Sequence, residues 1–291
     1  MTQRTWFITG VNSGFGRELA EQLLARGERV AGTVRREGSV DDLRAEYGER
    51  FWIEHLDVTD LAQVRDVVDA AFGELGRIDV VVINAGYGLF GAAEEFTDEQ
   101  VVHQITTNLL GSIQTARAAL PHLRAQGGGR IIQLSSVAGL AAHPGASLYH
   151  AGKWGVEGFM EALADEVAPF GIEVTLVEPG GARTSFAGSS LRLSEPLAAY
   201  DNTPAAAVRI FKDIAVPVPG DPVRVAAKII DSASQEPAPM RLVLGSDCYQ
   251  GATASLRKRL AQIEPQQASA AETDADTDAD ADTGADADAD A

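Results

Sequence analysis

A glycine-rich segment directly after the first apolar run constrains the fold of this chain more than any other feature. Residues 6–9 read Trp-Phe-Ile-Thr, and residues 10–16 read Gly-Val-Asn-Ser-Gly-Phe-Gly before a helical pattern that lasts to about residue 26. Glycines allow positive φ and let the backbone approach a pyrophosphate, which lies on the free N–H groups of the following helix. The order strand, loop, helix favours a dinucleotide site over a turn that serves packing alone.

Short runs rich in β-branched and aromatic residues recur along the chain with helical patterns between them. They cover residues 6–9, 29–34, 51–58, 80–84, 131–135, 174–177 and 242–244. This alternation predicts β-α-β units. Runs that are apolar at every position, such as 80–83, predict strands covered by helices on both faces. We therefore expect an α/β fold, a Rossmann-type doubly wound parallel sheet of about seven strands in a three-layer α/β/α sandwich.

The spacing of the glycines points to one family. The loop reads Gly-x-x-x-Gly-x-Gly after Thr9 and resembles the short-chain dehydrogenase/reductase family, a likeness that runs from about residue 5 to about residue 245. The resemblance implies cofactor contacts after four strands. The residues so assigned are Gly10, Asn12, Ser13, Gly14, Phe15, Gly16, Asp57, Val58, Asn84, Ala85, Gly86, Pro179, Gly180 and Thr184.

The end of the second strand bears on which nicotinamide dinucleotide is bound. A NAD-preferring site has an acidic residue there for the ribose 2′-hydroxyl, whereas this chain has Val34 followed by Arg35 and Arg36. A guanidinium suits a 2′-phosphate, so we expect NADP(H) with Arg35 as a contact. In the alternative, NAD(H) is bound, the two arginines are solvated charges and Glu37 contacts the hydroxyl.

Tyr149 and Lys153 open a strongly helical stretch and lie at i, i+4, on one helix face. Alone, such a pair is common on ordinary helices, but here it accompanies the glycine loop, Asn108 and Ser136. Reduction of a carbonyl leaves charge on its oxygen, so the site must deliver a proton there. A phenol can supply that proton, and a nearby ammonium lowers the phenol's pKa.

The resemblance implies a role for each member of this group. Tyr149 is the general acid or base, Ser136 donates a hydrogen bond to the substrate oxygen, and Asn108 positions a water that links Lys153 to solvent. Tyr149 and Lys153 also contact the cofactor, with Lys153 on the nicotinamide ribose. Ser135 competes with Ser136, but Ser136 precedes Tyr149 by the family's interval of thirteen residues. We expect no metal.

Residues 184–220 break the strand and helix rhythm, and a segment of this length is typical of a functional lid. Its large apolar residues, with others near the site, indicate a mid-sized apolar ketone or alcohol as substrate. These candidate walls are Phe186, Leu191, Leu193, Tyr200, Tyr87, Leu140 and Leu148. His143 and His150 lie near the site in sequence. We expect each side chain to be solvated, and contact with the substrate is the alternative.

The charge is concentrated at the C-terminal end. Ten of the acidic residues lie in residues 264–291, which leaves about −8 of the net charge of −18 for residues 1–263. We expect one domain over residues 1–263, followed by a disordered acidic Asp/Ala tail over 264–291 that has no bulky apolar residue to bury. This acidic balance disfavours nucleic acid and anionic membrane as partners.

Further expectations concern compartment, assembly and activity. The single cysteine, Cys248, cannot form an internal disulfide, and neither a signal peptide nor a spanning segment is recognised, so we expect a cytoplasmic protein. Helices over about 99–126 and 149–170 imply, by the family resemblance, a homodimer or homotetramer. A catalytically silent NADP(H)-binding sensor or scaffold is the alternative to an oxidoreductase.

Overall fold

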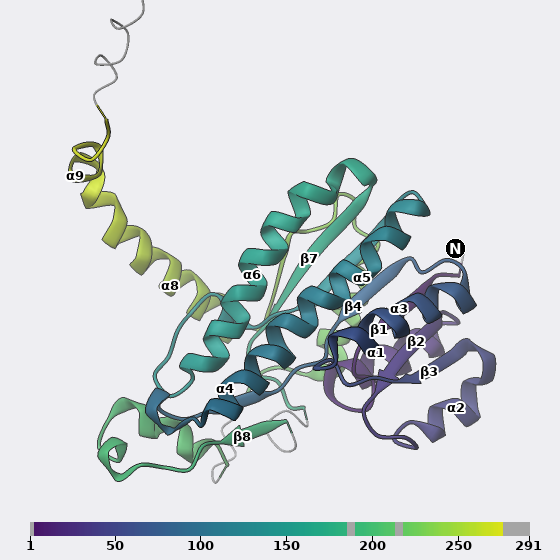
Figure 1. Cartoon of the computed structure of the whole chain (residues 1–291), viewed down its shortest axis with the longest axis horizontal. Coiled ribbons are helices and arrows are strands. Elements are labelled where there is room, and N and C mark those ends of the chain that lie inside the picture. The colour runs from purple at the N-terminus through teal and green to yellow at the C-terminus, as the bar shows by residue number, and fades with distance from the viewer. Residues whose placement is uncertain (1–2, 185–189, 213–217, 276–291) are drawn as a thin grey trace, which may run out of the picture.

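The computed structural model describes residues 3–184, 190–212 and 218–275, and its body is a parallel sheet between two layers of helices (Figure 1). The strand order is β3-β2-β1-β4-β6-β7-β9, so the direction of winding reverses between β1 and β4. The predicted doubly wound sheet is confirmed. Its strands are β1 (Thr5–Ile8), β2 (Arg29–Val34), β3 (Phe51–His55), β4 (Val80–Ile83), β6 (Gly129–Leu134), β7 (Ile172–Pro179) and β9 (Arg241–Leu244).

Helices cover both faces of the sheet, which explains why its strands are apolar on both sides. In β1, Phe7 packs into the core under one helical layer, and Trp6 and Ile8 pack into the core under the other. The first layer consists of α3 (Leu61–Leu75), α5 (Gly111–Ala125) and α6 (Ser147–Val167), and the second of α1 (Gly14–Ala25), α2 (Asp41–Tyr47) and α7 (Pro222–Ser232).

The helix predicted over about 99–126 is interrupted. It consists of α4 (Asp98–Ile105), a π-helical turn over Thr106–Leu110, and α5. Single π-helical turns inside α-helices are frequent at functional sites. This turn contains Asn108, one of the residues that the sequence indicates for catalysis.

Two short strands form a separate parallel pair that the sequence pattern did not predict. These are β5 (Gly88–Phe90) and β8 (Leu191–Leu193), paired from Gly88 with Leu191 to Phe90 with Leu193. Each strand has only three residues, too few for an alternating pattern to be recognised. The expected lid therefore contains β8 and two 3₁₀ turns, Ala198–Tyr200 and Pro204–Lys212. Phe186 lies outside the described residues.

The C-terminal helix projects from the body (Figure 1) and continues beyond the predicted domain boundary. After α8 (Ser246–Ile263), a 3₁₀ turn over Glu264–Gln266 leads into α9 (Gln267–Ala271), and residues 264–275 are exposed throughout. The expectation of disorder from residue 264 is thus corrected to helix as far as Ala271. Alanine and glutamine favour helix, and elongation of an existing helix needs no new nucleus. None of the described helices is long and apolar enough to span a membrane.

Candidate active site

Tyr149 and Lys153 lie one turn apart on α6 and are both buried. The Tyr149 hydroxyl is hydrogen bonded to the side chain of Ser136, at the carboxyl end of β6. The Lys153 ammonium lies 5.9 Å from the centre of the Tyr149 ring and donates a hydrogen bond to the Leu134 carbonyl oxygen at 2.8 Å. The fold therefore brings together the serine, tyrosine and lysine that the sequence indicates.

Burial moves the pKa values of these two groups in opposite directions. It raises the pKa of Tyr149 to about 12, although the hydrogen bond with Ser136 acts the other way. It lowers the pKa of Lys153 to about 8, against the opposing charge of Glu157. Near neutral pH the phenol thus holds its proton and the ammonium is mostly charged. Such a pair can donate a proton and stabilise the anion that remains.

The two adjacent serines point to different partners. The Ser135 hydroxyl donates a hydrogen bond to Glu157 within the protein interior. The Ser136 oxygen accepts a hydrogen bond from the Ala138 N–H at 3.1 Å and interacts with Tyr149. Ser135 is thus used within the interior, whereas Ser136 lies beside Tyr149.

Asn108 joins the loop after β4 to the helical layer. Its Nδ2 donates to the Tyr87 carbonyl oxygen at 2.7 Å, and its Oδ1 accepts from the Tyr87 N–H at 3.0 Å. A Cβ at Gly152 would lie 3.5 Å from that of Asn108, so α6 passes close to it. The side chain therefore holds the scaffold beside Lys153, a role that the sequence did not reveal.

The glycine loop fits a pyrophosphate. Gly10 and Gly14 have φ values of 76° and 58°, and a Cβ at Gly16 would lie 2.1 Å from the Gly10 carbonyl oxygen. Ser13 is the N-cap of α1 and makes no side-chain capping hydrogen bond. The first N–H groups of the helix are thus open to an anionic ligand, and the positive end of the helix dipole favours one.

Asn84 supports this loop from behind. Its Nδ2 donates to the carbonyl oxygens of Thr9 and Gly10 at 2.9 and 3.0 Å. In return, Thr9 Oγ1 accepts from the N–H groups of Asn84 and Ala85 at 2.9 and 3.0 Å. The Asn84 carboxamide is therefore used to connect the two cofactor loops, while Gly86 is exposed at the surface.

The other end of the crevice carries Arg35, Asp57 and Val58. Arg35 is exposed directly after β2. Burial opposes ionisation of Asp57, but hydrogen bonds from Thr59 and the charge of Arg35 leave the Asp57 pKa below its usual value. Val58 is buried against Gly111 of α5. The charge of Arg35 therefore acts on Asp57 at this end of the crevice.

The loop after β7 is tied to the start of α8. Asp247 Oδ2 accepts from the Gly181 N–H at 2.7 Å, and a Cβ at Gly180 would lie 2.2 Å from Asp247 Oδ1. Pro179 ends β7, and Thr184 is the last described residue of this loop. Sequence reasoning missed Asp247, because its contact joins segments more than sixty residues apart.

Several candidate substrate walls have structural partners. Tyr87 and Leu148 pack together in a small core cluster with Leu89.

His150 uses both ring nitrogens on backbone groups: Nε2 accepts from the His143 N–H, and Nδ1 lies 2.9 Å from the Ala138 carbonyl oxygen. His150 therefore holds the loop before α6, and burial lowers its pKa.

Phe90, which the sequence analysis did not single out, has its ring 5.4 Å from the Tyr149 ring in an edge-on arrangement. Phe90 is the last residue of β5, a strand that the sequence pattern did not predict. Among the remaining expected walls, Leu140 and Leu191 are buried and Leu193 is partly buried, while the Tyr200 hydroxyl donates to Glu94 at 2.8 Å.

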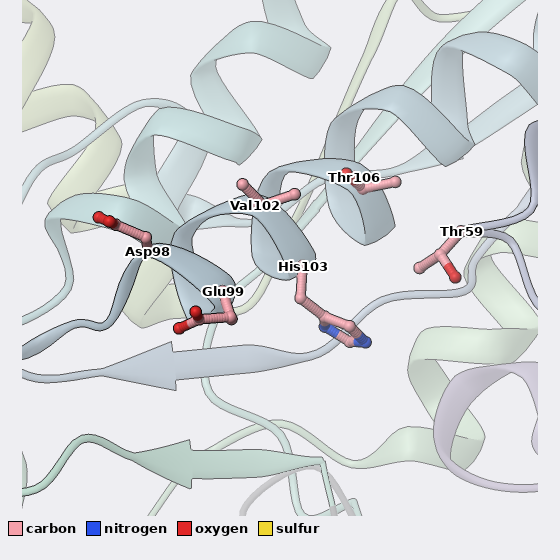
Figure 2. A pocket seen from close by; sticks show the side chains of 6 residues that line it. All are labelled: Thr59, Asp98, Glu99, Val102, His103 and Thr106. Carbon is pink, nitrogen blue, oxygen red and sulfur yellow. The ribbon is translucent and has the colours of Figure 1, made fainter.

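A hollow of about 490 Å³ lies elsewhere, on the outer side of α4 (Figure 2). Its lining consists of Thr59, Asp98, Glu99, Val102, His103 and Thr106, with none of the catalytic candidates. His103 Nδ1 lies 2.8 Å from the Tyr87 hydroxyl. In the described ranges, no cluster of three or more His, Cys, Asp or Glu side chains is suited to a metal ion.

Comparison with known proteins gives one consistent result. The short chain dehydrogenase family model matches residues 4–193. An oxidoreductase of Botryotinia fuckeliana is 39% identical over 251 residues, covering 85% of this chain and 90% of that protein.

Two solved structures share the fold. A short-chain dehydrogenase from Streptomyces avermitilis is 37% identical, with a TM-score of 0.87 over 94% of this chain and 100% of that one. A short chain dehydrogenase/reductase from Burkholderia phymatum in complex with NAD is 25% identical, with a TM-score of 0.77 over 91% of this chain and 95% of that one.

Proposed function

Because this chain belongs to the short-chain dehydrogenase family of oxidoreductases, we propose that it transfers a hydride between NADP(H) and the carbonyl or secondary alcohol group of a mid-sized apolar substrate. One observation carries this proposal: Ser136, Tyr149 and Lys153 converge at the carboxyl end of the parallel sheet, the same edge at which the glycine loop lies. In doubly wound sheets, ligands bind in the crevice at the carboxyl ends of the strands.

In the direction of reduction, the residues of this chain supply the proton and hold the reacting oxygen. The Ser136 hydroxyl donates a hydrogen bond to the substrate carbonyl oxygen, and the Tyr149 hydroxyl donates its proton to the same oxygen. The positive charge of Lys153 stabilises the phenolate that remains. The bound nicotinamide supplies the hydride. In oxidation, the phenolate accepts the proton from the alcohol.

The position of Lys153 is held by two features of the scaffold. Its ammonium donates to the Leu134 carbonyl oxygen at 2.8 Å, which fixes the side chain beneath the Tyr149 ring. The π-helical turn that contains Asn108 packs against α6 near Gly152. A fixed ammonium acts on the phenol without rearrangement during the reaction, which is the basis of electrostatic preorganisation.

The choice of NADP(H) rests on Arg35. The relative from Burkholderia phymatum is in complex with NAD, so family membership alone leaves both cofactors open. An acidic residue at the end of β2 would repel a 2′-phosphate, whereas this chain has exposed Arg35 and Arg36 after Val34. Arginine presents a planar fork of donors that matches a phosphate. We therefore assign the 2′-phosphate contact to Arg35.

Titration of the protein with NADPH and with NADH, followed by nicotinamide fluorescence, tests the cofactor. Loss of reduced nicotinamide absorbance over a panel of apolar ketones, aldehydes and quinones tests the reaction. We expect tighter binding of NADPH and turnover on at least one apolar carbonyl. Binding of NADPH without turnover on any of them would instead favour the sensor or scaffold function, and a preference for NADH would overturn the role of Arg35.

We also propose that the protein is a homodimer or homotetramer. Large apolar side chains are exposed in and next to α5 and α6: Leu110 directly before α5, Trp154 in α6 and Phe170 in the 3₁₀ turn after α6. Burial of these side chains in a second subunit would remove them from water. Light scattering on a size-exclusion column should give at least twice the mass of one chain. A single-chain mass at micromolar concentration would contradict the proposal.

A further inference from the structure

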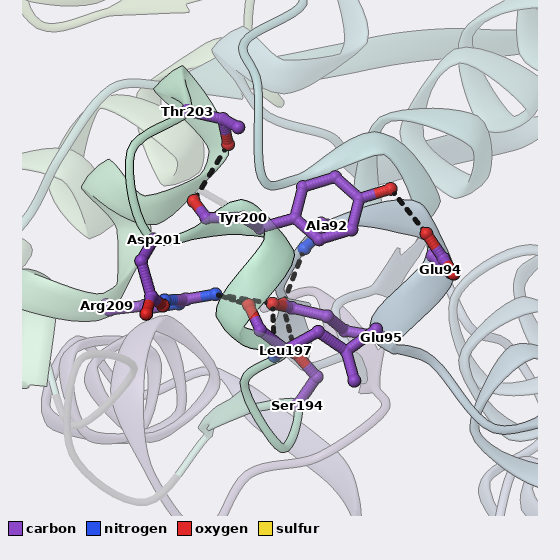
Figure 3. Close-up of polar contacts among 9 residues, drawn as sticks. All are labelled: Ala92, Glu94, Glu95, Ser194, Leu197, Tyr200, Asp201, Thr203 and Arg209. Carbon is purple, nitrogen blue, oxygen red and sulfur yellow. Dashed lines mark hydrogen bonds and ion pairs between the residues drawn. The ribbon is translucent and has the colours of Figure 1, made fainter.

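Glu95 connects the loop after β5 to the segment 190–212, which is far from it in sequence (Figure 3). Its carboxylate accepts hydrogen bonds from three groups of that segment: Ser194 Oγ at 2.9 Å, the Leu197 N–H at 3.0 Å and Arg209 Nη2 at 2.6 Å. A fourth comes from the Ala92 N–H at 2.8 Å. One carboxylate thus holds three separate points of the segment.

This carboxylate is almost completely removed from solvent. The Glu95 side chain is 2% exposed, and burial opposes its ionisation. The hydrogen bonds from the Leu197 and Ala92 N–H groups, followed by those from Arg209 and Ser194, nevertheless lower its pKa to about 2. A buried charge that loses its donors is costly, and so are buried donors that lose their acceptor. The interaction therefore selects one arrangement of the segment.

Two glycines let the segment lie directly on the loops that flank the active site. A Cβ at Gly91 would lie 1.8 Å from Ser194 Oγ, and a Cβ at Gly145 would lie 2.7 Å from Val208 Cγ1. The Gly91 N–H also donates to the Gly145 carbonyl oxygen at 2.7 Å. Gly145 is two residues before the start of α6, so this contact is close to the helix that carries Tyr149.

The segment is connected to Tyr149 through Phe90. The Ser194 N–H donates to the Phe90 carbonyl oxygen at 2.9 Å, and Phe90 pairs with Leu193 across β5 and β8. The Phe90 ring in turn lies 5.4 Å from the Tyr149 ring. The position of β8 is therefore coupled to that of Phe90, the apolar side chain beside the proton donor.

We propose that Glu95 is a positioning residue for substrate selection, which acts by anchoring Ser194, Leu197 and Arg209. The anchored segment forms a fixed wall beside Phe90 and Tyr149, and its position sets which sizes of carbonyl substrate are accepted. Glu95 itself does not contact the substrate. The selection step rests on the proposed oxidoreductase function, whereas the anchoring does not.

The neighbouring Glu94 offers a matched control. It is exposed and accepts a hydrogen bond from the Tyr200 hydroxyl at 2.8 Å, so it also contacts the segment but is not buried beneath it. Glu95→Gln keeps the shape of the side chain and removes its charge, and Glu94→Gln makes the same change next to it. A conservative pair, Arg209→Lys and Arg209→Met, tests the same anchor from the other side.

Kinetics over a series of ketones of increasing size tests selection. We expect Glu95→Gln to change the ratio of kcat/KM between the best bulky ketone and the smallest one by about tenfold or more, mainly through KM. Glu94→Gln should leave this ratio unchanged, and Arg209→Lys should have a smaller effect than Arg209→Met. An equal loss of kcat on every ketone would show a merely structural role and overturn the proposal.

Limited trypsin digestion without substrate tests the anchoring independently. The segment contains three trypsin sites, Arg192, Arg209 and Lys212. Cleavage after Arg192 requires β8 to leave β5, and cleavage after Arg209 requires its contact with Glu95 to open, so these two sites are the ones measured. We expect cleavage in Glu95→Gln to be about tenfold faster than in the wild type and in Glu94→Gln, with NADPH affinity unchanged. Equal cleavage rates in all three proteins would overturn the anchor. Since digestion needs no turnover, failure of the proposed function is distinguishable from failure of the anchor.

Discussion

The ammonium of Lys153 lies 5.9 Å from the centre of the Tyr149 ring, one turn further along α6. Burial has opposite effects on the two groups, since it raises the pKa of Tyr149 to about 12 and lowers that of Lys153 to about 8. Of these two groups, Lys153 is therefore the one whose charge changes closer to neutral pH. This relationship makes the pH dependence of the reaction a direct test of the site.

Reduction of a ketone should depend on protonated Lys153. We expect kcat to be constant at lower pH and to fall as the pH rises through about 8, where the ammonium loses its proton. Lys153→Met should reduce kcat by about 10²- to 10⁴-fold and abolish this fall at high pH. Initial rates from pH 6 to pH 10 would measure both. If kcat of Lys153→Met still fell as the pH rose through about 8, the titration would belong to another group.

Gly16→Ala should weaken cofactor binding because the added Cβ would lie 2.1 Å from the Gly10 carbonyl oxygen. The loop must shift to admit it, and we expect the NADPH dissociation constant to rise by about tenfold or more. Gly73→Ala in α3 is the control, since its added Cβ would meet no atom within 4 Å beyond its chain neighbours and the backbone of its own helix. Fluorescence titration measures the affinities. Equal NADPH affinities in the two variants would contradict the assignment of the glycine loop as part of the cofactor site.

Arg35→Ser should reduce discrimination between the two dinucleotides. Loss of a charge-assisted contact to the 2′-phosphate predicts a fall in NADPH affinity of about 10- to 100-fold, with little change for NADH. Arg36→Ser, one residue further into the exposed turn, should have the smaller effect. If Arg36→Ser lowered NADPH affinity and Arg35→Ser did not, the contact would belong to the second arginine.

Glu178 should make the folded state less stable as the pH rises. Its side chain is fully buried, and burial, with the charge of Glu157, raises its pKa from 4.5 to about 7, although Arg241 opposes this. A raised carboxyl pKa means that the folded state binds the proton more tightly, so the stabilisation is present below pH 4.5 and is lost through about pH 7. Glu178→Gln should remove this dependence.

Urea unfolding at pH 5 and pH 7.5 would measure the free energy of unfolding for both proteins. The wild type should lose more stability over this interval than Glu178→Gln, and other groups, such as His150, titrate in both and cancel. Glu161→Gln is the control because it contacts the same Arg241 from an exposed position. The same pH dependence in wild type and Glu178→Gln would contradict the raised pKa.

The sequence predicted those parts of the fold that have a local pattern. The strands of the main sheet are marked by apolar runs, and the loop containing Gly10 and Gly16 is marked by its spacing. For the strands and the glycine loop the information lies within a few consecutive residues, where periodicity and backbone conformation are decided. Tyr149 and Lys153, one helical turn apart, could be identified because they accompany this loop and Ser136 at the family's spacing.

The remaining features depend on contacts between distant segments. β5 and β8 are three residues each and are strands only because they pair with one another. Glu95 and Asp247 resemble ordinary surface acids in the sequence, yet Glu95 anchors the segment containing Arg209 and Asp247 holds the loop at Gly181. The extension of helix to Ala271 was missed because composition was weighed without the preceding helix.

The most direct test of the proposed function compares NADPH oxidation by the wild type and Tyr149→Phe, with the best ketone from the panel. Removal of the hydroxyl takes away the proton donor but leaves the ring packed against Phe90. We expect turnover to fall by about 10²- to 10⁴-fold while NADPH still binds. Retained turnover in Tyr149→Phe would show that another group delivers the proton, and would contradict the assignment of this site.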